Sequence, residues 1–212
     1  DRVRTLVLDG VAPFEMRIGE DFARDSQAAL QALFRRCAAD PACGGTHPDL
    51  ARRLADLLDR LDRRPEQVRT RDPLTARAIE VLLDGDAVRQ VVLGFLYAPE
   101  TAALPPPLLD QAAAGDLAPL AAQGILVAAD VGAGISRALQ LAVVCAEDVP
   151  FYRGGREAGT FLGDAAVRSF RALCRAWPSE AAAEGLIGLL RHPTVLSQAD
   201  WKEAEPEVDE LF

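Results

Sequence analysis

The chain has 212 residues, half of them hydrophobic, so it is long enough to bury the core of one large domain or two small ones. Its formal net charge of −9 at pH 7 repels phosphate backbones, which argues against general nucleic-acid binding. The longest apolar stretch, residues 124–144, is interrupted by charged, polar and glycine residues, so the sequence predicts no membrane span.

The first residues of the chain have the pattern of a buried strand. The apolar run Thr5–Leu8 ends at Asp9–Gly10, which is typical of one strand of a parallel sheet. Such a strand needs neighbours to pair with, and it indicates an incomplete sheet. The sequence also begins at Asp1 rather than at a methionine, and it opens with no signal peptide, so we expect it to be a segment of a longer protein.

Most of the remaining chain has the apolar spacing or the end signals of helices. We predict helices at about 19–38, 48–63, 87–97, 105–114, 117–129, 133–145 and 158–176. Val68–Arg71 and Ala78–Val81 flank the turn sequence Asp72–Thr75, which predicts a small β-hairpin. Residues 179–212 end in an acidic run that is typical of a solvated and partly disordered tail. The predicted fold class is therefore mainly α with minor β.

Four cysteines occur in the chain: Cys37, Cys43, Cys145 and Cys174. The first two flank Asp40–Pro41, a turn signal, so their thiols could face each other across a tight loop. We favour a disulfide over a zinc site here, because zinc needs a second closely spaced Cys/His pair that the sequence does not supply. A pair of free thiols is the remaining alternative. A disulfide would place the protein in an oxidising compartment.

A glycine-containing segment resembles part of a nucleotide-binding motif. Gly132 and Gly134 follow the apolar run Ile125–Val127, as in a strand, glycine turn and helix. The third glycine of that motif is missing, and no acidic residue stands at the expected distance. We therefore predict a turn before an amphipathic helix, and no cofactor.

Ser136 is a near miss for the nucleophile elbow of a hydrolase. That tight strand-to-helix turn needs glycine two positions before and two positions after the serine, but Ala138 follows Ser136. A catalytic serine also needs a histidine base, and the two histidines, His47 and His192, both have loop contexts. We therefore predict that this chain contains no complete triad.

The acidic pair Glu147–Asp148 follows an apolar helix and precedes the aromatic segment Val149–Tyr152. Carboxylates at a helix C-terminus are unfavourable to the helix dipole. Their presence beside aromatic residues marks a candidate functional site, whereas the alternative is a hinge loop with a solvated charge pair. The residues alone leave both interpretations open.

Several segments resemble, in order and spacing, the proline iminopeptidase and tripeptidyl aminopeptidase-like family of α/β-hydrolases. The resemblance covers roughly residues 1–178. It rests on Asp1–Pro13, Asp21–Asp25, Cys37–Cys43, Leu96–Thr101 and Val143–Pro150. The resemblance implies a secreted or cell-envelope serine hydrolase that removes residues or short peptides from peptide N-termini. Its substrate partner would be a peptide with a free N-terminus.

The resemblance also implies an architecture. Residues 1–13 would be a core strand and its exit loop, 14–178 a helical lid (cap) with a small hairpin, and 179–212 a degenerate core-return segment with an acidic tail. The fold would thus be the helical lid of an α/β-hydrolase plus one or two core strands.

Individual roles follow from the same resemblance. Glu147, and then Asp148, would hold the α-amino group of the substrate, since a carboxylate pairs with an ammonium group. Cys37–Cys43 would be a lid disulfide, and Cys145–Cys174 a second bridge.

The chain departs from the family where the catalytic residues should be. The nucleophile elbow would lie upstream of Asp1, and no histidine follows Pro193–Asp200, the segment that faintly resembles the returning strand and would make Asp200 the triad acid. We therefore expect this chain to be the lid and substrate-specificity portion of the hydrolase, inactive by itself. The alternative is a non-catalytic helical binding or interaction module.

Overall fold

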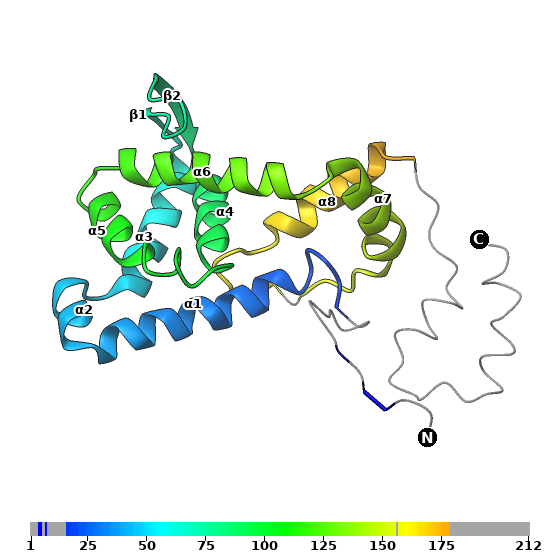
Figure 1. Ribbon diagram of the computed structural model, residues 1–212, viewed down its shortest axis with the longest axis horizontal. Helices are drawn as coiled ribbons and strands as arrows, with labels where there is room; N and C mark the ends of the chain where they lie inside the picture. Colours follow the sequence, from blue (N-terminus) through cyan, green and yellow to red (C-terminus); the bar gives the residue numbers. More distant parts are fainter. Residues whose placement is uncertain (1–3, 6, 8–15, 156, 179–212) are drawn as a thin grey trace, which may run out of the picture.

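The computed structural model describes residues 4–5, 7, 16–155 and 157–178. These residues form eight α-helices, one 3-10 helix and one two-stranded antiparallel sheet, so the predicted mainly helical fold is confirmed (Figure 1). Among these residues, no helix combines the length and the hydropathy needed to span a bilayer. The predicted strand Thr5–Gly10 lies largely outside the described residues, and the segment 179–212 with His192 and Asp200 lies wholly outside them.

The elements follow one another closely along the chain. In order they are α1 (Phe22–Ala39), α2 (Pro41–Thr46), α3 (Leu50–Arg63), β1 (Glu66–Arg71), β2 (Ala78–Leu83), α4 (Gly85–Phe95), α5 (Pro105–Ala113), α6 (Ala118–Gly134), α7 (Arg137–Glu147), η1 (Val149–Phe151) and α8 (Ala165–Ala176).

The hydrophobic core lies among α1, α3, α4, α5 and α6. Helix α3 has the clearest amphipathic pattern, because its buried leucines recur at intervals of three and four residues and so share one face. They are Leu50, Leu54, Leu57, Leu58 and Leu61. This face packs against buried residues of the other helices, including Phe95, Leu109 and Leu120, each at most 1% exposed.

Glycines allow α4 and α6 to approach closely. A Cβ at Gly94 of α4 would lie 2.3 Å from Cγ1 of Val127, and a Cβ at Gly124 of α6 would lie 2.8 Å from Cγ2 of Val91. Both distances are shorter than van der Waals contact, so each helix packs a valine against a glycine of the other.

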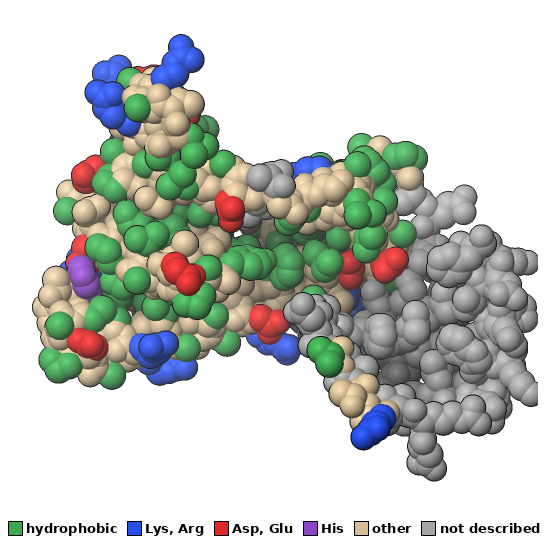
Figure 2. Space-filling model, in the orientation of Figure 1, with side chains coloured by type: hydrophobic (Ala, Val, Ile, Leu, Met, Phe, Trp, Pro, Cys, Tyr) green, Lys and Arg blue, Asp and Glu red, His purple; other side chains and the backbone are tan. Residues whose placement is uncertain are grey.

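The predicted hairpin is confirmed. Strands β1 and β2 pair antiparallel, with Thr70 opposite Ile79, and the carboxylate of Asp72 accepts hydrogen bonds from the backbone N–H groups of Leu74 (2.8 Å) and Thr75 (3.1 Å) in the turn. The hydroxyl of Thr70 donates to the carbonyl oxygen of Ala118, which ties the hairpin to α6. Its outer part projects from the helical body and carries basic side chains (Figures 1 and 2).

Both cysteine pairs form disulfides, Cys37–Cys43 and Cys145–Cys174. The interpretation of the first pair as a disulfide rather than a zinc site is thus confirmed, and so is the second bridge. The two disulfides are consistent with an extracellular protein.

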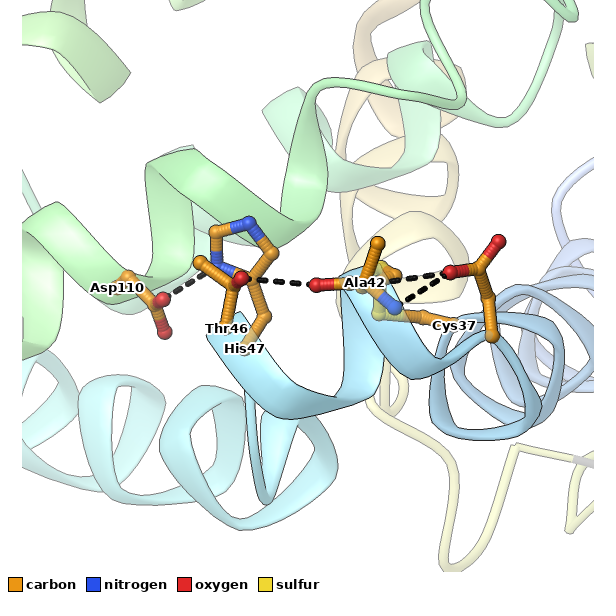
Figure 3. The surroundings of a disulfide bond; sticks show 7 residues. Cys37, Ala42, Thr46, His47 and Asp110 are labelled. Atoms are coloured by element: carbon orange, nitrogen blue, oxygen red, sulfur yellow. Dashed lines mark hydrogen bonds and ion pairs between the residues drawn. A yellow bond between two sulfur atoms is a disulfide. The ribbon is translucent and has the colours of Figure 1, made fainter.

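The disulfide Cys37–Cys43 braces the short helix α2, which local sequence patterns did not predict. Asp40–Pro41 is not simply a turn: Asp40 caps the helix, because its carboxylate accepts hydrogen bonds from the N–H groups of Ala42 (2.8 Å) and Cys43 (3.1 Å). At the other end of α2, Nδ1 of His47 contacts the carboxylate of Asp110 in α5 (Figure 3). His47 is therefore held in a structural contact.

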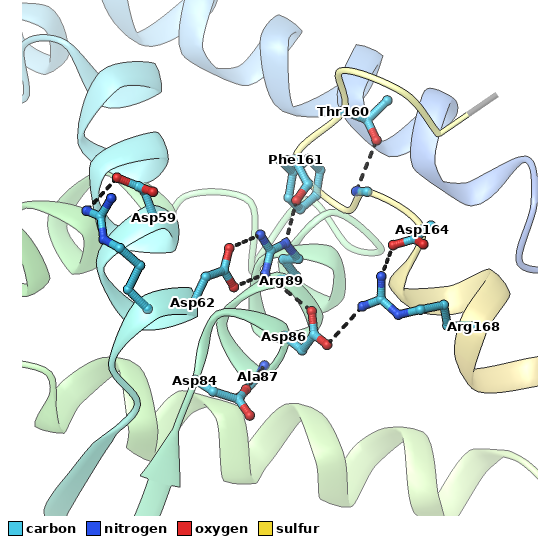
Figure 4. A network of polar contacts seen from close by, with 12 residues as sticks. Asp59, Asp62, Asp84, Asp86, Ala87, Arg89, Thr160, Phe161, Asp164 and Arg168 are labelled. Carbon is cyan, nitrogen blue, oxygen red and sulfur yellow. Dashed lines mark hydrogen bonds and ion pairs between the residues drawn. The ribbon is translucent and has the colours of Figure 1, made fainter. Parts of the chain in front are cut away.

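Helices α7 and α8 and the 3-10 helix η1 form a second packed region, which we call the α7–α8 unit. The disulfide Cys145–Cys174 joins its two helices. Arg89 of α4 ties the loop before α8 to the helix bundle: its guanidinium group donates to both carboxylate oxygens of Asp62 in α3 (2.7 and 2.6 Å) and to the carbonyl oxygen of Phe161 in that loop (2.9 Å) (Figure 4).

Two predicted boundaries were wrong. Helix α6 continues to Gly134, so Gly132 and Gly134 lie within a helix rather than in the predicted turn. The run Ile125–Val127 lies in the helix predicted at about 117–129, and Val127 packs against Gly94 of α4. Helix α8 begins at Ala165 rather than near residue 158, since Gly159 (φ 74°) and Gly163 (φ 53°) adopt a left-handed conformation that interrupts a helix.

Candidate functional site

The structure separates the two residues of the predicted acidic pair. Glu147 is the last residue of α7 and is exposed, whereas Asp148, at the junction with η1, is 4% exposed. The carboxylate of Asp148 accepts a hydrogen bond from the backbone N–H of Ile18 (3.2 Å), a residue 130 positions earlier in the chain. Asp148 thus joins the segment before α1 to the end of α7.

Two further buried carboxylates lie in the segment that Asp148 contacts. Glu20 is 0% exposed and Asp21 is 5% exposed, and together with Asp148 they form what we call the acidic cluster. Oε1 of Glu20 accepts a hydrogen bond from the N–H of Gly154 (2.5 Å), and Oδ2 of Asp21 accepts one from the N–H of Arg17 (2.7 Å).

Sequence reasoning missed Glu20 and Asp21. The signal that could have found them is the pair of acids directly before Phe22, where α1 begins. Acids at a helix N-terminus are ordinary capping residues, however, and their near-complete burial is visible only in the structure.

Two buried polar atoms at the acidic cluster lack a hydrogen-bond partner among the described residues. The guanidinium group of Arg17 lies near Glu20, with 3.6 Å between Nη1 and Oε2, which is too long for a hydrogen bond. Oε2 of Glu20 and Nε of Arg17 are both buried, and neither has a hydrogen-bond partner. A buried polar group in this state costs about 1–3 kcal/mol, which binding of a matching polar group would offset.

Tyr152 contacts both the segment before α1 and helix α8. Its hydroxyl donates to the carbonyl oxygen of Ile18, and its ring lies 5.8 Å from the guanidinium carbon of Arg171. Burial, and then the negative charge of Asp148, raise the pKa of Tyr152 above its ordinary value, against the opposing effect of Arg171. Tyr152 therefore stays protonated and remains a hydrogen-bond donor at neutral pH.

The backbone at Gly19 fits closely beneath Tyr152. Gly19 has φ 95°, and a Cβ at this position would lie 2.5 Å from the Tyr152 hydroxyl oxygen and 2.8 Å from Cδ2 of Phe170. A side chain at residue 19 would thus be strained and would collide with two aromatic residues. The turn that carries Arg17 and Glu20 is held in one position against η1 and α8.

This arrangement is suited to binding a cation. Three carboxylates with little access to water attract an ammonium or guanidinium group strongly, because charge-assisted hydrogen bonds are strengthened where water is excluded. Among the described residues, no group of three or more His, Cys, Asp or Glu side chains has the geometry of a metal site. The chemistry that these residues support is recognition of a positively charged group.

The structure does not bring the other candidate residues together. Ser136 precedes α7 and is exposed, while His47 follows α2 at the opposite end of the molecule (Figure 1). These two residues form no serine–histidine pair.

No family model, no curated protein and no solved structure matches this chain. The acidic cluster and the sequence resemblance are therefore the grounds for a functional proposal.

Proposed function

We propose that this chain is the lid and substrate-specificity portion of a serine α/β-hydrolase that removes residues or short peptides from peptide N-termini. The acidic cluster holds the free α-amino group of the substrate. The nucleophilic serine and the catalytic histidine are not among the described residues of this chain, so the chain contributes binding and selection rather than bond cleavage.

The observation that carries this proposal is the unmet acceptor of Glu20. Glu20 is 0% exposed, and its Oε2 has no hydrogen-bond partner within the described part of the chain. An α-ammonium group carries three donors, so it would supply the missing hydrogen bond, and its positive charge would add to that of Arg17. A substrate with a blocked N-terminus would leave the buried carboxylate unsatisfied and be rejected.

The position of Asp148 supports the proposal and changes the order of the two predicted residues. Asp148 lies in the acidic cluster together with Glu20, whereas Glu147 is exposed at the end of α7. We propose Glu20 and Asp148 as the ligands of the α-amino group, with Glu147 at the rim of the site, where it attracts the ammonium group over a longer distance.

Access to Glu20 requires a local movement, because its carboxylate is fully buried. The N–H of Gly154 covers Oε1, and Gly154 (φ 72°) and Gly155 (φ 82°) both adopt left-handed conformations. In the proposed cycle, the glycine segment moves aside to admit the substrate and closes over its amino group.

The test is a comparison of free and blocked N-termini. We expect the purified chain to bind trialanine amide at least tenfold more tightly than N-acetyl-trialanine amide in isothermal titration calorimetry. Glu20→Gln removes the charge at similar size and should abolish this preference. Glu100→Gln, at an exposed position between α4 and α5, is the matched control and should retain it.

Two outcomes would contradict the proposal. Equal affinity for the two peptides would show that the site does not recognise an amino group. Turnover of a peptidyl chromogenic substrate by this chain alone, blocked by a serine-directed inhibitor, would contradict the assignment as a non-catalytic lid and would return attention to Ser136.

A non-catalytic interaction module is the second candidate, and an exposed apolar surface favours it. Leu139 (65% exposed) and Val143 (36%) lie one turn apart on α7, and Leu173 (43%) lies on α8 beside the disulfide. Figure 2 shows hydrophobic side chains gathered over this part of the molecule. In an interaction module, Leu139→Asp would abolish partner binding and Glu20→Gln would not, whereas the lid proposal expects Glu20→Gln to abolish recognition of the substrate amino group.

A further inference from the structure

The hairpin of β1 and β2 has a packed base and an exposed end. Val68 in β1 and Leu83 in β2 are buried, and both belong to the hydrophobic core. Residues 71–78, which we call the hairpin tip, are exposed apart from the half-buried Asp72. The hairpin tip projects from the helical body and contributes no residue to the core (Figure 1). Its side chains are therefore free to contact another surface.

The hairpin tip is held in one conformation by its own hydrogen bonds. The N–H of Asp72 donates to the carbonyl oxygen of Arg77 (2.9 Å), and the N–H of Ala76 donates to the carbonyl oxygen of Asp72 (2.8 Å). The carboxylate of Asp72 accepts hydrogen bonds from the N–H groups of Leu74 and Thr75. Because these bonds fix the turn, its side chains lose little conformational entropy on binding.

A large apolar side chain lies in this turn. Leu74 is 63% exposed, and its neighbour Pro73 is exposed as well. A single exposed leucine is ordinary on a flat protein surface. Leu74 differs because it lies on a projecting element, where a lipid bilayer can accept it without a pocket of matching shape. A protein partner would need such a pocket, so the geometry favours a bilayer.

Two arginines flank Leu74. Arg71 and Arg77 are both exposed, and neither forms an ion pair within the described part of the chain, whereas Arg69 is paired with Glu80. Nη1 of Arg71 donates to the carbonyl oxygen of Ala76 (3.1 Å), which uses one of the five N–H groups of the guanidinium. Guanidinium groups donate paired hydrogen bonds to phosphate oxygens, so both arginines are suited to lipid head groups.

The rest of the chain is poorly suited to an anionic surface. Its formal net charge is −9, so the body repels anionic lipids. Strand β1 continues for three residues beyond the buried Val68, which spans about 10 Å at about 3.3 Å per residue. This length exceeds the Debye length of about 8 Å at physiological ionic strength. The charge of the body is thus largely screened from a surface that the hairpin tip contacts, and Figure 2 shows basic side chains at this end of the molecule.

We propose that the hairpin tip docks on an anionic lipid bilayer. Leu74 enters the boundary between head groups and acyl chains, while Arg71 and Arg77 bind phosphate oxygens of the head groups. One leucine and two arginines give weak and reversible attachment. This inference goes beyond the proposed function, because it adds a surface at which the protein attaches and does not depend on the acidic cluster.

The test is sedimentation of the purified chain with sucrose-loaded vesicles. We expect binding to vesicles of phosphatidylcholine and phosphatidylglycerol in equal parts, and binding at least about fivefold weaker to phosphatidylcholine alone. Leu74→Ala should weaken binding to the mixed vesicles about tenfold, because less apolar surface leaves water. Leu139→Ala, at a leucine of similar exposure on α7, is the matched control and should bind as the wild type.

A second pair of variants separates position from net charge. The double variant Arg71→Gln/Arg77→Gln should bind the mixed vesicles at least about tenfold more weakly, because each arginine near an anionic surface contributes about fivefold. Arg24→Gln/Arg35→Gln removes the same charge at two exposed positions of α1 and should change binding by less than about twofold. Circular dichroism of each variant verifies that the chain is folded.

Three outcomes would overturn the proposal. The wild type could fail to bind the mixed vesicles. Equal losses for the two double arginine variants would show that net charge alone acts. Full binding by Leu74→Ala, together with release of the wild type from the vesicles by polyglutamate, would show a purely ionic contact and assign the hairpin tip to an acidic protein instead.

Discussion

Two parts of this molecule are stabilised in different ways. In the part formed by α1 and α3–α6, the buried members of the main hydrophobic cluster all lie between Leu30 and Ala121. Among the described residues of the α7–α8 unit and the loop before α8, the buried apolar side chains are only Val144, Cys145, Leu162 and Val167, and a disulfide joins the two helices.

The difference in apolar burial indicates which of the two parts opens more readily. A helix bundle with a continuous apolar core opens cooperatively and rarely, whereas a region with few buried apolar contacts opens at a lower free-energy cost. The acidic cluster lies at the border of the second part, where η1 meets the turn before α1. A site that must admit and enclose a ligand is thus placed beside the less densely packed part.

The largest expected effect comes from emptying the core of the helix bundle. Phe95 is 0% exposed, so Phe95→Ala should lower the free energy of unfolding by about 3–5 kcal/mol. Leu74→Ala, at a residue that is 63% exposed in the hairpin turn, should change it by less than about 0.5 kcal/mol. Urea denaturation followed by circular dichroism measures both. Similar losses for the two variants would show that the assigned core does not carry the stability.

The next effect separates the two disulfides. Cys145–Cys174 closes a loop with a sequence separation of 29, and Cys37–Cys43 one with a separation of 6. Each disulfide restricts the unfolded chain, and the longer loop is restricted more. Replacing Cys145 and Cys174 by serines should therefore lower the free energy of unfolding by about 3–4 kcal/mol, and replacing Cys37 and Cys43 by about 2 kcal/mol.

The two double variants should also differ in where the chain becomes accessible to a protease. Replacing Cys145 and Cys174 should increase proteolysis within the α7–α8 unit, because that region has little other apolar burial. Replacing Cys37 and Cys43 should affect α2 alone. Equal losses of stability, with the same cleavage pattern for both double variants, would contradict the proposed difference between the two parts.

The smallest effect concerns the polar link between the two parts. The hydrogen bonds from Arg89 lower the pKa of Asp62 below its ordinary value, and its burial opposes them. A carboxyl whose pKa is lowered on folding stabilises the protein above its unfolded pKa of about 3.9, and this contribution is lost as the pH falls through the lower, folded pKa.

Asp62→Asn should therefore lower stability at pH 7 by no more than about 1 kcal/mol, since the Asp62 side chain is 43% exposed and solvent screens the pair. The difference between the variant and the wild type should shrink as the pH falls below 4. Melting temperatures measured from pH 7 to pH 2.5 are the readout. A difference that does not depend on pH would show that the charge of Asp62 is not involved.

Local sequence patterns predicted much of the fold. The leucines of α3 recur with a helical period, and the turn residue Asp72 between two alternating segments predicts the hairpin. Patterns failed at the end of α6, where Gly132 and Gly134 predicted a turn but lie within the helix. They also failed at the start of α8, where glycines in left-handed conformations delay the helix.

The candidate site shows the same division. The sequence alone singled out Glu147–Asp148, the pairing of Cys37 with Cys43, and the resemblance to a family of peptidases. Only the tertiary structure showed that Asp148 is buried while Glu147 is exposed, and that Glu20 and Arg17 retain unmet hydrogen-bonding groups. The physical reason is that burial and counter-charges depend on residues 130 or more positions apart, such as Ile18 and Asp148, and helical periodicity or turn signals do not encode such contacts.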